Sequence, residues 1–559
     1  MLIIELKIAK SYYKSCHSKL LKHSLNIAFS IPLQLNFLFK MADLKLAKRR
    51  NKIKKLMRYH KYPALLLSVF IIAFAISGII LNHRILFSNF SVDRDWLGQN
   101  YQYRNWNMSS LKSVLIIDSN TNILYGNVGI WKADSNLEHL TRFDQGIPET
   151  VDQRKIGVMC QTKSGDLFAG SLFGLYHFNA QNKTWEEIPL PNGSERIYSI
   201  LENKNGFFVM GRNNIYRTEN SKAPYSFETV KLKEPENYDG KIGLFQTFWQ
   251  IHNGDIFGIT GKLIMDLVAI LFIFLVLTGI YHWLAPRRMK QLRLANKNYD
   301  HIKKWKRGTK KWHNKLGNWF LILLIISTLT GMFLRPPLLI AIATSKVAKI
   351  PFTHLDNPNP WHDRLRALFY DEAKGIYLIG TATGIYSVDE NFEQQAHYFE
   401  HQAPISVMGI NELSKLNEKE YLVGTFLGLF KWNPVDKETI DYITNEKGIV
   451  WDPNARPLSD KMVGGYFKKA NGHEYYFDFN NGATNIRHHD YFPEMTQEVL
   501  DESPMSLWNF AQETHTGRIY RFMFGKLYIL FIPLSGMTIL MLLIVGWRLE
   551  RRLYTKPKK

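Results

Sequence analysis

Six histidines at the ends of apolar segments are the residues of this sequence whose type and position could do chemistry. They are His60, His83, His252, His282, His313 and His515. Imidazole is a common metal ligand and a standard axial ligand of haem iron. Ligating side chains at membrane depth usually mark function, although a single neutral imidazole is also tolerated at a membrane interface. The set therefore indicates a metal or haem site between helices.

Four of these histidines belong to an internal repeat. In each copy, one histidine precedes a glycine by eighteen residues across an apolar segment. A second histidine lies in a His-x-Gly tripeptide before another apolar segment. The matching pairs are His60–Gly78 with His313–Gly331, and His252–Gly254 with His515–Gly517. The chain is thus organised as two copies of helix, insert and helix.

Each apolar segment is long enough to cross a bilayer, because about 20 residues at about 1.5 Å each cover a hydrocarbon core of about 30 Å. The sequence therefore predicts an integral membrane protein, in which a four-transmembrane-helix bundle carries two extracytoplasmic all-β, propeller-like inserts. Helices are expected over 62–83, 251–284, 313–335 and 515–547, β inserts over 84–250 and 336–514, and basic segments over 1–61, 285–312 and 548–559.

The net charge of +22 is concentrated beside the predicted helices. Lysine and arginine crowd the segment 45–58, the loop 285–312 and the tail 548–559. By the positive-inside rule these segments and both termini face the cytoplasm, and the two inserts lie outside. The lipid bilayer is then the expected partner, and this distribution argues against nucleic acid.

Three further features carry less weight. Cys16 and Cys160 should lie on opposite sides of the membrane, so no internal disulfide is expected. Residues 1–40 are interpreted as an upstream extension, because Met41 followed by a basic segment is a more natural start. The run 488–490, His-His-Asp, could bind a metal outside the membrane, but a solvated loop is the favoured interpretation.

A glycine-aromatic pattern recurs in both inserts. Strands that end in glycine are followed by a turn and an aromatic residue, and these glycines are Gly126, Gly170, Gly211, Gly380 and Gly424. The period of about 40–45 residues is that of a four-stranded propeller blade. The segments resemble blades of the two-component-regulator propeller type, the alternative being a generic antiparallel sheet. Because a few blades expose sheet edges, we expect one shared ring or two packed half-rings.

The repeat also assigns candidate ligands. Two hairpins of the same orientation, related by an axis along the membrane normal, present equivalent residues to a shared centre. The resulting pairs are His60 with His313 near the inner face, and His252 with His515 near the outer face. His83 is an alternative outer ligand, and His282 ranks below it. The helix glycines Gly78, Gly279 and Gly331 could make room for a flat macrocycle or serve ordinary helix packing.

The residues around these histidines resemble the PepSY-associated transmembrane-helix family. The resemblance rests on Leu56-Met-Arg-Tyr-His60, Lys311-Trp-His313-Asn-Lys-Leu-Gly317 and Thr278-Gly279-Ile-Tyr-His-Trp283. That family of iron-regulated bacterial inner-membrane proteins includes ferric-siderophore reductases with b-type haems. The resemblance implies an inner-membrane location, two haem b groups on the four paired histidines, and a role in iron uptake. The inserts depart from the family, because propeller-like repeats stand where PepSY-type modules would be expected.

The leading hypothesis is transmembrane electron transfer from quinol or another donor, through two bis-histidine haems, to a ferric chelate or another periplasmic acceptor. This would make the protein an oxidoreductase. No dinucleotide-binding fingerprint occurs, so a flavin or nicotinamide domain is not expected within the chain. The competing hypothesis is a haem-free sensor or scaffold, whose propeller binds a periplasmic ligand or partner and whose helices only anchor it.

Overall fold

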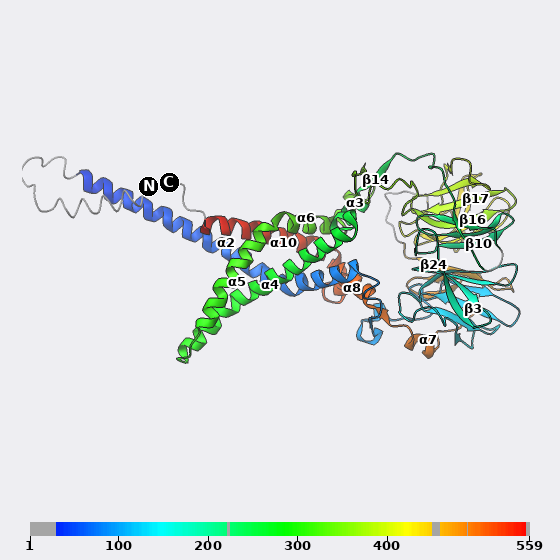
Figure 1. Ribbon diagram of the computed structural model, residues 1–559, viewed down its shortest axis with the longest axis horizontal. Coiled ribbons are helices and arrows are strands. Elements are labelled where there is room, and N and C mark those ends of the chain that lie inside the picture. The colour runs from blue at the N-terminus through cyan, green and yellow to red at the C-terminus, as the bar shows by residue number, and fades with distance from the viewer. Residues whose placement is uncertain (1–29, 221–223, 450–458, 489, 555–559) are drawn as a thin grey trace, which may run out of the picture.

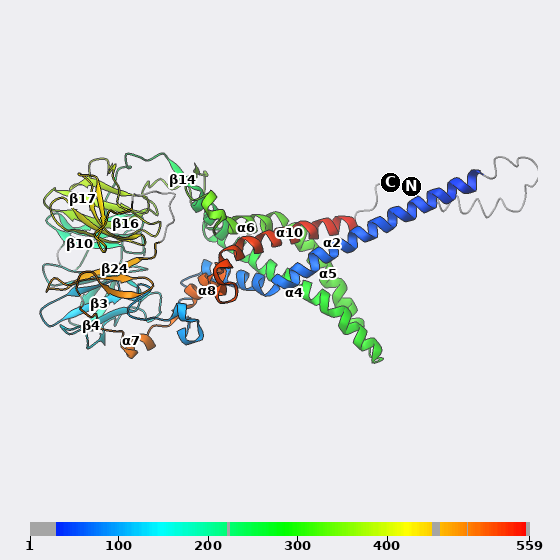
Figure 2. The same cartoon turned by 180° about the vertical axis from the view of Figure 1, so that it is seen from behind.

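The computed structural model describes residues 30–220, 224–449, 459–488 and 490–554, and it consists of a helical part and a β part (Figure 1). The two parts lie end to end along the long axis, as Figure 2 shows from behind. Cys16 and most of the expected upstream extension fall within residues 1–29, outside the described residues.

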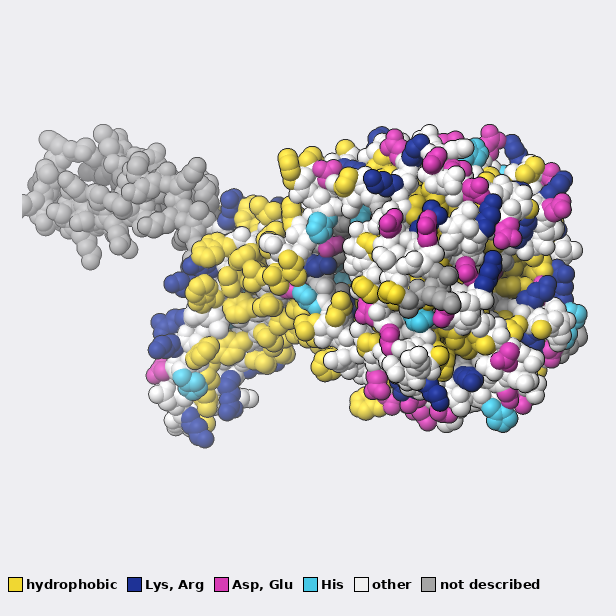
Figure 3. All heavy atoms as spheres, turned by 45° about the vertical axis from the view of Figure 1, so that its right-hand side comes forward, with side chains coloured by type: hydrophobic (Ala, Val, Ile, Leu, Met, Phe, Trp, Pro, Cys, Tyr) yellow, Lys and Arg dark blue, Asp and Glu magenta, His cyan; other side chains and the backbone are white. Residues whose placement is uncertain are grey.

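Within the described part of the chain, three helices are long and apolar enough to cross a membrane. They are α2 (Ser30–Asn82), α4 (Gly258–Leu294) and α10 (Tyr528–Tyr554). Helix α2 contacts both others, and Leu67, Ile71 and Ile539 form a small core between α2 and α10. No more than 33% of the most apolar window of each span is buried within the protein, so most of this surface is left for lipid. Figure 3 shows it as a broad hydrophobic surface with lysine and arginine at the end far from the β part.

The third predicted span differs from the single helix expected over 313–335. It is a pair of helices, α5 (Asp300–Trp319) and α6 (Leu321–Phe333), bent by 65°. Lysine and arginine are spread along α5, whereas α6 is mainly apolar and has no charged residue, so the two helices suit different surroundings. The 13 residues of α6 rise about 20 Å, which is less than the hydrocarbon core, so a fourth span requires both helices together.

Shorter helices connect the spans to the β part. The α-helices are α3 (Leu244–Asn253), α7 (Gln497–Asp501), α8 (Leu507–His515) and α9 (Arg521–Phe524). The 3-10 helices are η1 (Arg94–Trp96), η2 (Gln99–Tyr101), η3 (Asp255–Phe257), η4 (Leu338–Ala341), η5 (Arg518–Tyr520) and η6 (Gly525–Leu527). Helix α3 packs on α6, and α8 packs on α2.

The β part consists mainly of antiparallel sheets in which each strand pairs with its neighbours in sequence. The first insert forms β2–β5 (Ser113–Ile116, Asn122–Gly126, Gly129–Ala133, Thr141–Arg142), β6–β9 (Ile156–Gln161, Leu167–Ser171, Leu175–Asn179, Thr184–Ile188) and β10–β13 (Ser199–Asn203, Gly206–Met210, Ile215–Thr218, Glu228–Thr229). The second insert forms β16–β19 (Leu365–Asp371, Ile376–Thr381, Ile385–Asp389, His397–Tyr398), β20–β23 (Ile410–Lys415, Tyr421–Thr425, Gly428–Asn433, Glu438–Asp441) and β24–β26 (Val463–Lys468, Glu474–Asp478, Gly482–Asn485).

The glycine-aromatic pattern builds the hairpin between the second and third strands of a sheet. Gly126 pairs with Gly129 across a two-residue turn, and Gly129 has a φ of +98°, a backbone conformation that favours glycine. The aromatic residue that follows, Trp131, is fully buried and bonds through Nε1 to the Val128 carbonyl at 3.0 Å. The recurring sequence pattern therefore marks one turn and one core side chain.

These sheets close into a ring. The first strands β2, β6, β10, β16, β20 and β24 contact one another in that order, and β24 contacts β2. Two of the contacts, β10 with β16 and β24 with β2, join the first insert to the second. Phe208 packs against Tyr377 at one of them, and Trp106 packs against Phe492 and Phe477 near the other. Both inserts therefore contribute to one shared structure.

Two short sheets connect the ring to the helices. Strand β1 (Ser91–Val92), which follows α2, pairs with β27 (Met505–Ser506), which precedes α8. Strand β14 (Lys241–Gly243), which precedes α3, pairs with β15 (Lys346–Ala348), which follows α6. Each sheet therefore joins a segment that leaves the bundle to one that returns, and the two sheets repeat the internal symmetry of the sequence.

Candidate functional site

The histidines of the two His-x-Gly tripeptides meet at the end of the bundle next to the ring. His252 lies near the end of α3 and His515 is the last residue of α8. Their Nε2 atoms are 3.5 Å apart, their ring centroids are 5.8 Å apart and their planes are inclined by 53°. These two residues, 263 positions apart in sequence, form the outer histidine pair.

The Nδ1 atoms of this pair are held by backbone carbonyls. His252 Nδ1 lies 3.0 Å from the Ser327 carbonyl oxygen, and His515 Nδ1 lies 3.0 Å from the Phe74 carbonyl oxygen. A carbonyl can only accept, so Nδ1 carries the proton and Nε2 presents a lone pair on each neutral ring. Metal-bound histidines usually show this same bond from the second ring nitrogen. Two facing lone pairs make the outer pair suited to an electrophilic metal centre.

Small residues on the opposite helices make room for both rings. A Cβ atom on Gly331 would lie 2.7 Å from His252 Cε1, and one on Gly78 would lie 3.4 Å from His515 Cε1. The residue before each glycine has a hydroxyl group close to the imidazole. The Thr330 hydroxyl lies 3.3 Å from His252 Nδ1, and the Ser77 hydroxyl lies 3.1 Å from His515 Nδ1. Gly279, by contrast, has nothing within 4 Å of such a Cβ. Two of the three helix glycines therefore accommodate imidazoles.

The glycine of each His-x-Gly tripeptide ends the short helix that positions the histidine. Gly254 has a φ of +83° and Gly517 a φ of +77°, so both adopt the left-handed conformation common after helix C-termini. The chain then turns into the next membrane helix. The spacing of the tripeptide thus has a structural cause, because the histidine occupies the last turn before the glycine.

A second group of histidines lies at the other end of the bundle. The rings of His60 and His313 are 6.3 Å apart and perpendicular. His60 Nδ1 lies 3.0 Å from the Leu542 carbonyl oxygen, and His313 Nδ1 lies 2.8 Å from the Thr278 hydroxyl. Along α2, the 17 residues from His60 to the Ser77 contact of the outer pair rise about 26 Å, so the two groups are at opposite membrane depths.

His282 belongs to this second group of histidines, although it was the lowest-ranked candidate ligand in the sequence analysis. Its ring lies 6.1 Å from that of His313, as near as His60. Its Nε2 is buried without a hydrogen-bond partner among the described residues. The repeat could not find it, since the equivalent part of α10 has no histidine. Its place at the end of an apolar segment was the available signal.

His83 is engaged elsewhere. Its Nε2 lies 2.6 Å from Asp266 Oδ2, and Asn82 Nδ2 donates to the other oxygen of that carboxylate at 3.2 Å. This histidine therefore pairs α2 with an acidic residue of α4. Sequence reasoning did not single out Asp266, although it is the one carboxylate in the apolar stretch of α4.

The His-His-Asp run and the cysteine add no further centre. His473 Nδ1 lies 2.8 Å from Asp490 Oδ2 and its ring stacks on that of His488, while residue 489 lies outside the described part. Among the described residues, no three or more His, Cys, Asp or Glu are grouped to hold a metal ion. Burial raises the pKa of Cys160 to about 11, so it remains a thiol.

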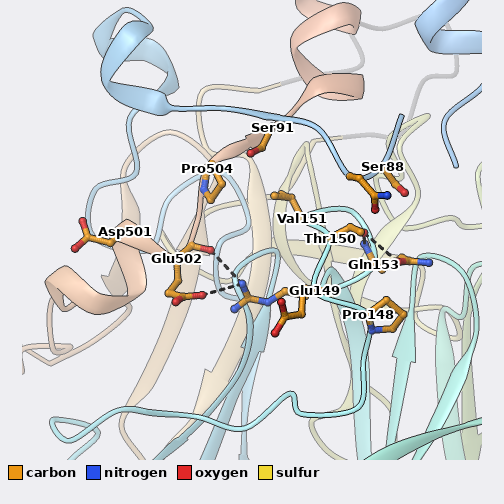
Figure 4. Close-up of a pocket in the computed structure, with 12 residues that line it drawn as sticks. Ser88, Ser91, Pro148, Glu149, Thr150, Val151, Gln153, Asp501, Glu502 and Pro504 are labelled. Carbon is orange, nitrogen blue, oxygen red and sulfur yellow. Dashed lines mark hydrogen bonds and ion pairs between the residues drawn. The ribbon is translucent and has the colours of Figure 1, made fainter. Parts of the chain in front are cut away.

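A cavity of about 600 Å³ lies where the ring meets the bundle (Figure 4). Its walls come from the segment after α2, from the loop before β6 and from the segment before α8. Arg154 Nε bonds Asp144 Oδ2 at 2.6 Å, and its Nη1 lies 3.3 Å from Glu502 Oε2. Arg142 bonds the same two carboxylates. The charges beside this cavity are thus largely paired with one another.

The chain belongs to the family defined by the PepSY-associated TM region, whose model matches residues 37–284 and 180–551. It is therefore a membrane protein with several apolar helices. No curated protein matches it.

Solved structures show only distant likeness. The extracellular domain of the putative hybrid two component system BT4673 from B. thetaiotaomicron is 13% identical with a TM-score of 0.33, over 68% of this chain and 33% of that one. A structural genomics protein of unknown function from Bacteroides thetaiotaomicron is 10% identical over 71% of both chains, with a TM-score of 0.33. PorZ of Porphyromonas gingivalis is 10% identical over 70% and 40%, with a TM-score of 0.31. This chain spans about a third of the BT4673 domain.

Proposed function

We propose that this protein carries electrons across a bacterial inner membrane to an oxidised periplasmic acceptor. The observation that carries the proposal is the outer histidine pair, whose neutral rings face each other through Nε2 while backbone carbonyls hold Nδ1. Both imidazoles of this pair would hold one haem iron. The preferred acceptor is ferric iron or a ferric-siderophore chelate, because the family resemblance points to iron uptake.

The donor set fits a haem at both levels. At the outer level, His252 and His515 would hold the group, because their Nε2 atoms face each other 3.5 Å apart. At the inner level, His313 has His60 and His282 at nearly equal ring distances. We assign haem b to both levels, with His252 and His515 as outer ligands and His60 and His313 as inner ones.

When bound, haem supplies reversible one-electron chemistry. The protein's own contribution is to hold each Nδ1 proton and to leave Nε2 as the ligating nitrogen. Each ferric ion that is reduced takes one electron. A quinol that gives two electrons and two protons therefore supplies two ferric ions, and a protein donor at the inner face would serve equally.

The proposed architecture follows from the same features. The six sheets act as one propeller outside the membrane, and α5 with α6 completes a four-helix bundle. Basic residues gather at the bundle end far from the ring (Figure 3). The positive-inside rule places that end, with both chain termini, in the cytoplasm.

The visible spectrum of full-length protein, purified from haem-replete cells, tests this function. We expect a Soret band, the α-band of a reduced b-type cytochrome and two haems per chain. His252→Ala and His60→Ala should each lose or alter one haem and leave the other, because the levels are about 26 Å apart. His139→Ala is the matched control, since this imidazole is 84% exposed on the ring. Protein without a Soret band would favour the haem-free scaffold.

A further inference from the structure

The first strands of the ring begin on the side that faces the bundle. The chain enters β2 after leaving α2, and it enters β16 after leaving α6. A sheet of four antiparallel strands returns the chain to the side on which it started, so the next first strand begins there too. The loop before β6 confirms the side, because its Asp152 accepts a bond from Arg84, two residues beyond α2, at 2.8 Å.

Three cationic side chains gather at these strand starts. Lys112 directly precedes β2, Arg196 lies three residues before β10, and Arg366 is the second residue of β16. The guanidinium carbons of both arginines lie over the ring of Tyr198, at 4.8 Å for Arg196 and 5.4 Å for Arg366. Lys112 reaches across to β20, where its Nζ donates to Asn411 Oδ1 at 2.7 Å. Residues from four sheets thus converge, and we call them the cationic cluster.

Two of these cations lack a carboxylate partner. Among the described residues, Lys112 and Arg196 form no ion pair. Arg366 bonds the backbone carbonyls of Leu365 and Asp363, at 2.7 and 2.9 Å, and is 4.0 Å from the Asp363 carboxylate.

The nearby carboxylates are already engaged. Asp363 is bonded by Arg212, and Glu195 accepts from the Arg212 backbone at 2.7 Å and from Asn213 and Tyr216. Arg196 is exposed to solvent, whereas Lys112 is half-buried, and a half-buried cation without a counter-charge is costly. Burial and the charge of Arg196 accordingly lower the pKa of Lys112 to about 7. At the cavity beside Arg154, by contrast, both arginines are paired with carboxylates.

We propose that the cationic cluster is an anion subsite that receives the ferric chelate, and that the chelate it accepts carries net negative charge, as polycarboxylate or catecholate complexes do. This assignment rests on the proposed function. The cluster lies on the side of the ring that faces the outer histidine pair. A bound chelate therefore lies between the ring and the outer histidine pair, from which the electron would leave. Each bound ferric ion takes up one electron and becomes ferrous, while the chelator is neither oxidised nor cleaved.

Binding of ferric citrate to full-length, oxidised protein in detergent tests the subsite. Lys112→Gln and Arg196→Gln should each raise the Kd for ferric citrate by about tenfold or more, the usual loss for one charged hydrogen bond. A neutral ferric trihydroxamate should bind weakly to the unmodified protein and respond to neither substitution. Lys132→Gln, which removes the same charge from an exposed position on β4, is the matched control and should leave both affinities unchanged.

Folding and chelate selectivity are checked separately. Thermal unfolding of each variant shows whether the ring is intact, and Lys112→Arg should restore most of the affinity by keeping the charge. Unchanged ferric citrate binding in both Gln variants would overturn the proposal, and so would iron-free citrate that binds as tightly as the ferric complex. If the purified protein contains no haem but the Gln variants still lose ferric citrate binding, the proposed function is rejected while the anion subsite is retained.

Discussion

His252 and His515 are each held by a helix of the other sequence repeat. His252, from the first copy, has its Nδ1 on the Ser327 carbonyl of α6, while His515, from the second copy, has its Nδ1 on the Phe74 carbonyl of α2. The two copies therefore exchange contacts reciprocally around one point. Neither copy could orient its own imidazole alone, which explains why the histidine, the glycine and their spacings are duplicated together.

The space beside each imidazole gives the first prediction. Gly331→Ala should displace His252, because the added Cβ would lie 2.7 Å from its Cε1. Gly78→Ala should have a smaller effect, since its Cβ would make ordinary contact with His515 at 3.4 Å. Reduced-minus-oxidised spectra and haem content report the change, and Gly279→Ala, with open space around its Cβ, is the control. Equal spectra for Gly331→Ala and Gly279→Ala would show that Gly331 is not needed to make space for His252.

Much of this arrangement could be predicted from the sequence. Equal spacings in two copies indicated the pairs His60–His313 and His252–His515, and the structure brings the members of each pair together. The bend at Phe320 could not be predicted, because apolar composition sets whether a segment enters a membrane and not where it bends. His282 and Asp266 lack counterparts in the other copy, so comparison of the two copies could not identify either residue. The cationic cluster joins residues from four sheets, and only closure of the ring brings them together.

The junction between ring and bundle gives the second prediction. The Asp152 side chain is fully buried, and although burial opposes its ionisation, Arg84 and Lys155 lower its pKa well below the usual value. Arg84→Gln should lower the free energy of unfolding by up to about 3 kcal/mol at pH 7. This is near the lower end of the range for breaking a buried ion pair, because Lys155 still pairs with Asp152. Thermal unfolding in detergent measures the loss.

The same pair has a defined pH dependence. A lowered carboxyl pKa contributes stability above the unfolded value of about 3.9, and that stability is lost as the pH falls below it. The difference between Arg84→Gln and unmodified protein should therefore shrink in acid. Arg217→Gln, at an exposed pair with Glu219, should cost less than about 1 kcal/mol at any pH. A difference that stays constant down to pH 3 would contradict the assigned role of Asp152.

Closure of the ring gives the third prediction. An isolated 84–250 insert would expose the faces of β2 and β10 that normally contact the second insert. Buried aromatic residues such as Trp106 and Phe208 would then meet water, so we expect aggregation or non-cooperative unfolding. Co-expression with the 336–514 insert should restore a cooperative transition. A monomeric 84–250 fragment as stable as the full protein would show that mutual closure is unnecessary.

Membrane topology gives the fourth prediction. Reporter fusions that end at Lys297 and at Asn411 should give opposite answers, cytoplasmic for the first and periplasmic for the second. Lys297 lies in the basic hairpin between α4 and α5, whose translocation the positive-inside rule opposes. Asn411 lies on β20 of the ring. A periplasmic signal at Lys297 would contradict the proposed membrane topology.

The cationic cluster gives the last prediction, a pH dependence of anion binding. Burial and the charge of Arg196 lower the pKa of Lys112 to about 7. As the pH rises from 6 to 8, Lys112 therefore loses its positive charge. This loss disfavours a bound anion.

The Kd for ferric citrate should therefore rise by about tenfold or more between pH 6 and pH 8 in unmodified protein, since the Lys112 charge contributes about as much as one charged hydrogen bond. Bound anion stabilises the protonated amine, so the midpoint should shift above pH 7 when the ligand is present. Lys112→Gln should flatten the profile. The exposed control Lys132→Gln should retain the full slope. A Kd that is constant from pH 6 to pH 8 in unmodified protein would show that Lys112 does not face the bound anion.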